Sequence, residues 1–134
     1  MSIKLIATDL DGTLLMPDHV TVSDENIAAM KAAAENGIRI VIASGRTLEV
    51  FPFGIKKLKF LSYALMSNGA SMIAFDYPGT GEAMTHSPIT EMPYDIWEPV
   101  YRKMAEAGTE PEIYALGKSF MDRKRSDSYA SSLI

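Results

Sequence analysis

Three short runs of apolar residues dominate the first half of the chain. They lie near residues 3–8, 38–43 and 63–66, and the first is almost continuous, which is typical of a strand covered on both faces. Between the first two runs, Ser23 has the character of a helix N-cap and Gly37 that of a helix end, with apolar residues at helical spacing between them. A strand, a helix and a second strand in this order favour a right-handed crossover. We therefore expect a parallel sheet with the strand order 3-2-1.

The remaining elements are shorter or less regular. Pro52 and Gly54 weaken the helix expected over residues 48–59. Residues 14–22 form a loop with apolar ends and are expected to fold as a small hairpin or flap over the end of the first strand. The other expected elements are a β-hairpin over 71–75 and 82–86, a helix over 94–107 that contains Pro99, and two strands over 112–116 and 119–123.

Polar residues follow each of the three predicted strands. Asp9 and Asp11 come after the first strand, Ser44 after the second and Asn68 after the third. Ligands of open α/β sheets bind at the carboxyl ends of the strands, so we expect these four side chains to line one crevice. A hydroxyl and exposed amides at a strand end make an anion site, and Gly12 allows close approach of the backbone.

Two carboxylates beyond a strand end suit phosphoryl transfer. One carboxylate can attack phosphorus to form an aspartyl-phosphate, and a second can protonate the leaving oxygen and later activate water. Mg²⁺ is often held by one or two carboxylates together with the substrate phosphate. A calcium loop of the EF-hand type is excluded, because Thr13 and Val20 occupy positions that require an acidic or amide residue. A plain turn is the alternative interpretation of the motif alone.

The sequence Asp-Leu-Asp-Gly-Thr at residues 9–13, preceded by an apolar strand, resembles the first motif of the haloacid dehalogenase-like (HAD) superfamily. Ser-Gly-Arg at 44–46 and Asn-Gly at 68–69 resemble the Cof-type branch of that superfamily, whose members carry an inserted α/β cap. The resemblance implies an α/β fold: the N-terminal half of a three-layer, Rossmann-like core with a parallel sheet over 1–87, and the beginning of the cap over 88–134.

The resemblance also implies roles for individual residues. Asp9 is expected to be the nucleophile and Asp11 the general acid/base, with the Asp9 carboxylate and the Asp11 backbone carbonyl as Mg²⁺ ligands. Ser44 is expected to bind the transferring phosphoryl group. For Arg46, substrate contact and a surface ion pair or helix cap are both open, and His19 is expected to be a solvated loop residue. The other residues expected around phosphate and substrate are Leu10, Gly12, Thr13, Gly45 and Asn68.

Composition narrows the classes of function. The 134-residue chain has a formal net charge of −4, so it lacks the basic surface typical of nucleic-acid binding. No segment approaches the roughly 20 apolar residues of a membrane span, and there is no signal-peptide pattern. The absence of Cys excludes disulfides and thiolate metal sites. We expect a cytoplasmic protein whose partner is a small phosphorylated metabolite, with no nucleic acid or membrane.

The leading hypothesis is a Mg²⁺-dependent phosphohydrolase acting on a small phosphorylated metabolite, such as a sugar phosphate. Asp11 favours hydrolysis because an acid/base is then available to discharge the aspartyl-phosphate. A phosphomutase is the alternative in the same class. The alternatives in other classes are a non-catalytic fragment or binding module with a half-built site, and a phospho-accepting signalling domain of the doubly wound type.

Two motifs of the family pattern do not occur after residue 70. These are a lysine that stabilises the aspartyl-phosphate and a Gly-Asp motif that completes the Mg²⁺ shell. The expectation is therefore the N-terminal portion of a longer enzyme, with low activity of the 134-residue chain alone. In such a portion, residues 3–8 would form an exposed sheet edge that favours self-association.

Overall fold

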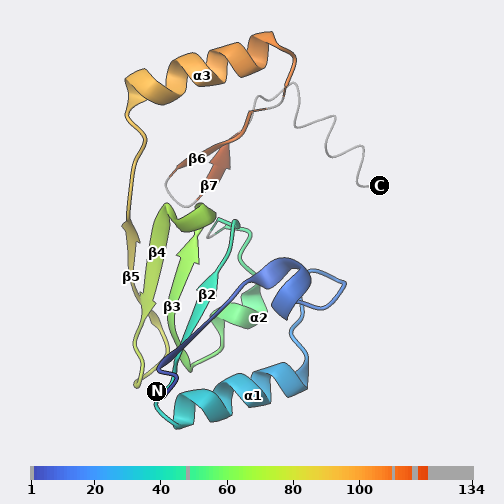
Figure 1. Ribbon diagram of the computed structural model, residues 1–134, viewed down its shortest axis with the longest axis vertical. Coiled ribbons are helices and arrows are strands. Elements are labelled where there is room, and N and C mark those ends of the chain that lie inside the picture. The colour runs from blue at the N-terminus through green and yellow to red at the C-terminus, as the bar shows by residue number, and fades with distance from the viewer. Residues whose placement is uncertain (1, 48, 110, 116–117, 121–134) are drawn as a thin grey trace. The chain divides into compact units, whose positions relative to one another are not determined.

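The computed structural model describes residues 2–47, 49–109, 111–115 and 118–120 (Figure 1). The chain divides into two units, Met1–Thr90 and Glu91–Ile134, and each contains its own sheet. In chain order, the first unit contains β1 (Leu5–Thr8), α1 (Asp24–Glu35), β2 (Arg39–Ala43), α2 (Phe53–Lys56), β3 (Leu61–Met66), β4 (Ser71–Phe75) and β5 (Ala83–Pro88), and the second contains α3 (Tyr94–Glu106), β6 (Ile113–Ala115) and β7 (Lys118–Phe120).

The sheet of the first unit has the order β1-β2-β3-β4-β5. β1 pairs with β2 and β2 with β3 in parallel, which confirms the predicted order 3-2-1. β4 and β5 extend the sheet as an antiparallel hairpin at the predicted position. Because β1, β2 and β3 run in the same direction, the polar residues that follow them come to one edge of the sheet.

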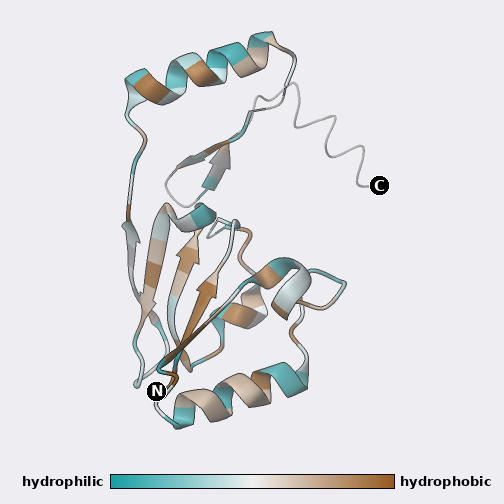
Figure 2. Ribbon diagram, in the orientation of Figure 1, coloured by the Kyte–Doolittle hydropathy of each residue, from teal (hydrophilic) through white to brown (hydrophobic). Residues whose placement is uncertain are grey.

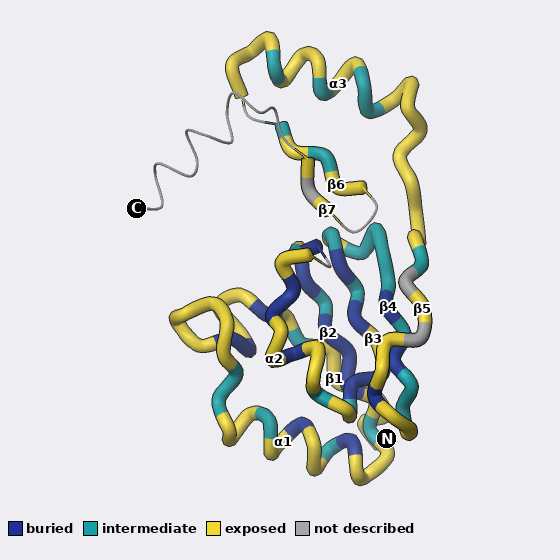
Figure 3. The backbone as a smooth tube through the Cα atoms, turned by 180° about the vertical axis from the view of Figure 1, so that it is seen from behind, coloured by how far each residue is buried: buried dark blue, intermediate teal, exposed yellow. Residues whose placement is uncertain are grey.

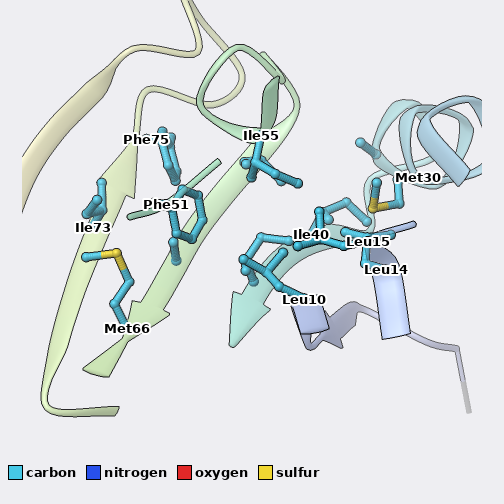
Figure 4. Close-up of a cluster of buried hydrophobic side chains, with 14 residues drawn as sticks. Leu10, Leu14, Leu15, Met30, Ile40, Phe51, Ile55, Met66, Ile73 and Phe75 are labelled. Carbon is cyan, nitrogen blue, oxygen red and sulfur yellow. The ribbon is translucent and has the colours of Figure 1, made fainter. Parts of the chain in front are cut away.

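One face of this sheet carries the hydrophobic core (Figure 4). Ile40 and Ile42 of β2 are fully buried there, and Met30 of α1 and Ile55 of α2 pack into the same cluster. The Ser23 hydroxyl accepts a hydrogen bond from the Asn26 amide at 3.2 Å, so α1 begins at the predicted N-cap. The helix and the two strands that the sequence predicts therefore form the crossover that brings β1 beside β2.

β1 is much more exposed than β2, its partner in the sheet, as Figure 3 shows. Leu5 is 52% exposed and Ile6 37%, so the expectation of a strand covered on both faces is wrong for the described residues. The reason is position: β1 pairs with β2 alone and lies at the edge of the sheet. Self-association through this edge stays a prediction.

The helix expected over 48–59 is reduced to the four residues of α2, and residue 48 lies outside the described part of the chain. α2 begins directly after Pro52, whose ring is unfavourable in the interior of a helix but fits at its start. In Figure 2, β2 and β3 are rich in apolar residues. The face of the sheet that carries the hydrophobic core is covered here by α2 and the loop before it, which contribute Ile55 and Phe51 to the core cluster.

The second unit contains the predicted helix and two strands. α3 covers nearly the expected range and includes Pro99, and none of its residues is buried. β6 and β7 form an antiparallel pair; residues 116 and 121–123 of the expected strands lie outside the described residues. No helix in the described part of the chain is long and apolar enough to cross a membrane.

Candidate active site

The segment after β1 is anchored by two leucines. Leu10 is fully buried and Leu14 is 7% exposed, so both point into the core. Asp9 has an extended backbone, and Gly12 has a φ of 73° that turns the chain. The buried leucines and the turn leave the side chains between them, including Asp11, on the surface. Of the residues expected around phosphate, Leu10 therefore has only its backbone available for a ligand.

Backbone hydrogen bonds join the loops that follow β2 and β3. The Ser44 amide donates to the Leu65 carbonyl at 2.9 Å, and the Asn68 amide donates to the Ser44 carbonyl at 3.3 Å. The Ser67 amide donates to the Arg46 carbonyl at 3.0 Å. These bonds hold the two predicted phosphate-binding loops side by side, and Ser44 itself is only 6% exposed.

The loop after β3 has an uncommon conformation. Ser67, Asn68 and Gly69 have φ values of 51°, 54° and 89°, in the left-handed region that disfavours most side chains. Asparagine and glycine tolerate this region best, which explains the Asn-Gly sequence. The Asn68 side chain packs over Gly45, where a Cβ would lie 3.0 Å from Asn68 Oδ1. The lack of a side chain at Gly45 thus allows the Asn68 side chain to lie this close.

A hollow of about 380 Å³ lies where the three strands end. Asp9 borders it from β1, Ser44 from β2 and Asn68 from β3. Within the described part of the chain, the Asp9 carboxylate makes no hydrogen bond or ion pair. Asp11 is not among the bordering residues, so the structure brings together three of the four predicted side chains. The complete lining is Asp9, Ala43, Ser44, Gly45, Leu65, Asn68 and Gly69.

Asp11 is instead the centre of a second group of side chains, here called the Asp11 cluster: Asp11, Arg46 and His19. Arg46 donates from Nε to Asp11 Oδ2 at 2.8 Å and from Nη2 to Asp11 Oδ1 at 2.6 Å. His19 Nδ1 lies 3.1 Å from Asp11 Oδ1. The two bonds from Arg46 form a bidentate, charge-assisted pair, the strongest type of side-chain ion pair.

Contacts within the Asp11 cluster lower the pKa of the Asp11 carboxyl group. The hydrogen bonds from Arg46 lower the pKa of Asp11 to about 2; partial burial opposes this shift and the contact with His19 adds to it. The pKa of Arg46 is raised by the same bonds with Asp11. At neutral pH, Asp11 is therefore a carboxylate in this arrangement.

The predicted flap is a small hairpin, and residues 15–22 are called the flap below. Leu15 and Val22 form its bridge, and the Met16 amide donates to the Thr21 carbonyl at 2.8 Å. His19 is 67% exposed, as expected of a loop residue, but its contact with Asp11 was not predicted. No local signal could reveal this contact, because it depends on how the flap folds back over the end of β1.

The oxygen atoms near Asp9 are suitable ligands for Mg²⁺, but they would occupy only some of its coordination positions. Hard divalent ions prefer oxygen ligands, and Mg²⁺ commonly keeps water and substrate phosphate beside one or two carboxylates. Asp9 offers a carboxylate without another partner, and the backbone carbonyl of Asp11 follows two residues later. Among the described residues, no three acidic or histidine side chains gather into a metal-binding group. The donor set therefore fits an ion that takes its other ligands from water and substrate.

Known proteins provide an independent comparison. The phosphatase YcsE of Bacillus subtilis, which acts on 5-amino-6-(5-phospho-D-ribitylamino)uracil, is 34% identical over 96 residues, which are 72% of this chain and 38% of that protein. The HMP-PP phosphatase of Klebsiella pneumoniae is 30% identical over 93 residues, which are 63% of this chain and 34% of that protein. The chain thus spans little more than a third of the length of these two relatives.

A solved structure has the same fold. A phosphatase of the haloalkanoate (HAD) enzyme superfamily from Bacteroides thetaiotaomicron superposes with a TM-score of 0.72 at 23% identity, over 96% of this chain and 47% of that one. The family model of the haloacid dehalogenase-like hydrolases matches residues 6–131, nearly the whole sequence. The strand-end motifs, the fold and this match agree, and the chain belongs to the haloacid dehalogenase-like hydrolase family.

Proposed function

We propose that this chain carries the nucleophile, the general acid/base and part of the phosphate site of a Mg²⁺-dependent phosphatase. Its substrate would be a small phosphorylated metabolite. The observation that carries the proposal is the hollow at the carboxyl end of the sheet, where Asp9, Ser44 and Asn68 meet. Relatives that are named as phosphatases support the same reaction class.

Asp9 is the proposed nucleophile. Its carboxylate borders the hollow and is not engaged by another described residue, so one oxygen is available to attack phosphorus. The new bond joins this oxygen to phosphorus, and the bond from phosphorus to the leaving oxygen breaks. Water then attacks the phosphorus of the aspartyl-phosphate, which releases inorganic phosphate and restores the Asp9 carboxylate.

Ser44 and Asn68 are the proposed contacts of the phosphoryl oxygens. The Ser44 hydroxyl oxygen already accepts a hydrogen bond from the Arg46 amide at 3.2 Å, which leaves its own O–H to donate. The Asn68 side-chain amide supplies further donors at the border of the same hollow. Donors fixed in this way stabilise charge that develops on the phosphoryl oxygens without having to reorganise during the reaction.

Asp11 is the proposed general acid/base. As a carboxylate it can accept the proton of the attacking water in the second step. In the first step it must donate a proton to the leaving oxygen, which the contact with Arg46 opposes. An anionic phosphate ester nearby would raise the pKa of Asp11, because like charges disfavour the ionised form. The substrate itself thus favours the protonation that the first step requires.

The Asp9 carboxylate and the Asp11 backbone carbonyl are the residues that would hold Mg²⁺. The ion would neutralise the repulsion between Asp9 and an anionic phosphate ester. The second unit would be the beginning of the cap that the resemblance places over residues 88–134, and a cap of this kind would contribute to substrate selection.

The experiment is phosphoenzyme trapping in protein that includes this chain. With a labelled phosphate ester and Mg²⁺, acid-quenched wild type should retain label on Asp9, and Asp9→Asn should retain none. Asp24→Asn is the matched control, because Asp24 is an exposed residue in the first turn of α1 and should not affect labelling. Turnover by Asp9→Asn at the wild-type rate would overturn the proposal.

The second candidate is a binding module without turnover. It is favoured by the lining of the hollow, which includes no lysine among the described residues, although the family pattern uses one beside the aspartyl-phosphate. Binding of inorganic phosphate by titration calorimetry, with no phosphoenzyme and no turnover, would support this candidate over the phosphatase.

A further inference from the structure

Arg46 connects three segments that are separate in the sequence. Its guanidinium binds Asp11 after β1, the His19 carbonyl in the flap at 2.9 Å, and the Val50 carbonyl at 3.3 Å. Its own backbone is held by the Ser44 hydroxyl and by the Ser67 amide. The arginine thus lies where the flap and the two phosphate-binding loops meet, outside the set of residues that line the hollow.

The guanidinium has little capacity left for a substrate. Nε and Nη2 contact both oxygens of Asp11, Nη2 also donates to the His19 carbonyl, and Nη1 donates to the Val50 carbonyl. The side chain is only 21% exposed. Lysine could not replace these contacts, because an ammonium group lacks the planar arrangement of donors that matches a carboxylate.

His19 contacts Asp11 through its ring and Arg46 through its backbone carbonyl. Its φ of 56° is unfavourable for a histidine and persists only where contacts compensate for it. In this conformation the carbonyl faces Arg46 and the ring faces Asp11. The tip of the flap is therefore fixed to the same two residues that are bonded to each other.

We propose that Arg46 is a positioning residue: it holds the Asp11 carboxylate in one place and, through the His19 carbonyl, keeps the flap closed over the end of β1. Asp11 needs such support because it belongs to an exposed turn beside Gly12. The part that concerns catalysis rests on the proposed function, whereas the part that concerns the flap does not. Arg46 would then act through Asp11 and not by contact with the phosphate.

The first test varies the leaving group of the substrate to distinguish action of Arg46 through Asp11 from direct contact of Arg46 with the phosphate. An alkyl phosphate needs a proton on its leaving oxygen, whereas p-nitrophenyl phosphate releases a stable anion and needs little help. In Arg46→Ala, kcat/KM should fall about 100-fold for the alkyl ester, the scale of general acid catalysis, and less than about fivefold for the aryl ester. Arg46→Lys should behave like Arg46→Ala. Equal losses on both substrates would overturn the catalytic part.

The second test is a double-mutant cycle with Asp11. If Arg46 acts through Asp11, Arg46→Ala should reduce kcat/KM by less than about twofold in an Asp11→Asn background. An undiminished loss in that background would mean that Arg46 contacts the phosphate ester directly, and would contradict the proposal. Lys31→Ala is the matched control, because Lys31 pairs with Glu35 on the exposed surface of α1, outside the candidate site, and its loss should change kcat/KM for neither substrate.

The third test needs no activity. Hydrogen exchange of the flap amides, Met16 and Thr21 above all, should become about tenfold faster in Arg46→Ala and not change in Lys31→Ala. Amides of β3 and β4 report whether the variant is folded. His19→Ala, which keeps the carbonyl but removes the ring, should give a smaller increase. An unchanged flap in a folded Arg46→Ala variant would overturn the proposal, even if wild-type protein proved to have no phosphatase activity.

Discussion

The carboxyl end of the sheet has two sides that are built differently. On one side, Asp9 borders the hollow with Ser44 and Asn68, and its carboxylate is engaged by none of the described residues. On the other side, both oxygens of the Asp11 carboxylate are bonded to Arg46, and His19 contacts one of them. Two aspartates separated by one residue thus have opposite surroundings.

This difference indicates how one short motif can supply two chemical roles. A carboxylate without a partner is available to bind a metal ion or attack phosphorus, whereas a carboxylate held by an arginine has a defined position and a lowered pKa. The division arises because the chain leaves the extended conformation after Asp9 and coils over Leu10–Leu14, which ends the alternation that would place residues 9 and 11 on one face. The predictions below test whether the two sides are as distinct in function as they are in structure.

The largest effect is expected from changing the two aspartates separately. Asp9→Asn should reduce kcat by about 10⁴-fold or more on every substrate, because the proposed nucleophile is lost. Asp11→Asn should reduce it by about 100-fold to 1,000-fold on alkyl phosphates and much less on aryl phosphates. Steady-state kinetics on both ester classes measures this. Similar losses for both variants on both classes would show that the distinction has no functional meaning.

The next effect concerns Ser44, on the side of the hollow. Removing its hydroxyl in Ser44→Ala should lower kcat/KM by about 100-fold, the usual cost of losing one donor to a developing anion. Ser62→Ala is a matched control, because the Ser62 hydroxyl is a buried group on β3 without a hydrogen-bond partner and is outside the hollow. The control should retain activity. Full activity of Ser44→Ala would remove Ser44 from the phosphate site.

A smaller effect is expected where the two loops touch. A Cβ at Gly45 would lie 3.0 Å from Asn68 Oδ1, so Gly45→Ala must displace the Asn68 amide by a few tenths of an ångström. Kinetics should show a loss in kcat/KM of roughly threefold to tenfold, since misplacement by a full ångström costs about 100-fold. The double variant Gly45→Ala with Asn68→Gly should show no loss beyond that of Asn68→Gly alone. Additive losses would mean that Gly45 acts in another way.

The smallest effect concerns a third carboxylate, that of Asp18 in the flap. The Thr21 hydroxyl and the backbone amides of Thr21 and Val20 lower the pKa of Asp18 to about 2. A folded pKa below the ordinary aspartate value of 3.8 stabilises the flap above that pH, and this contribution is lost as the pH falls towards 2. Thr21→Val should move the Asp18 titration, followed by carbon NMR, back towards 3.8.

Salt provides the control for this titration. The partners of Asp18 that hold its pKa down are mainly neutral, so high salt should leave its midpoint nearly unchanged. Asp11 depends on the charge of Arg46, so its midpoint should rise in salt, which screens an ion pair. If both midpoints respond alike, the two carboxylates are held by the same kind of interaction and the comparison fails.

Local signals in the sequence were sufficient to predict much of the fold and the side of the site that borders the hollow. Runs of apolar residues and the Ser23 cap are local signals, and they located β1, α1 and β2 correctly. Asp9, Ser44 and Asn68 follow directly on predicted strands, so the rule that parallel strands end at one edge was sufficient to bring them together. Their convergence needed only strand order, which the βαβ pattern implies.

The pairing of Arg46 with Asp11 and the burial of each strand depend on tertiary structure. Arg46 and Asp11 are 35 residues apart, and their pairing depends on how two loops and the flap meet, which no sequence window contains. The apolar runs of β1 and β2 are alike, yet Leu5 is half-exposed and Ile40 fully buried. Burial depends on the number of neighbouring elements, and β2 has a strand on each side whereas β1 has one. A pattern of residues predicts a strand, but its position in the sheet determines how far it is buried.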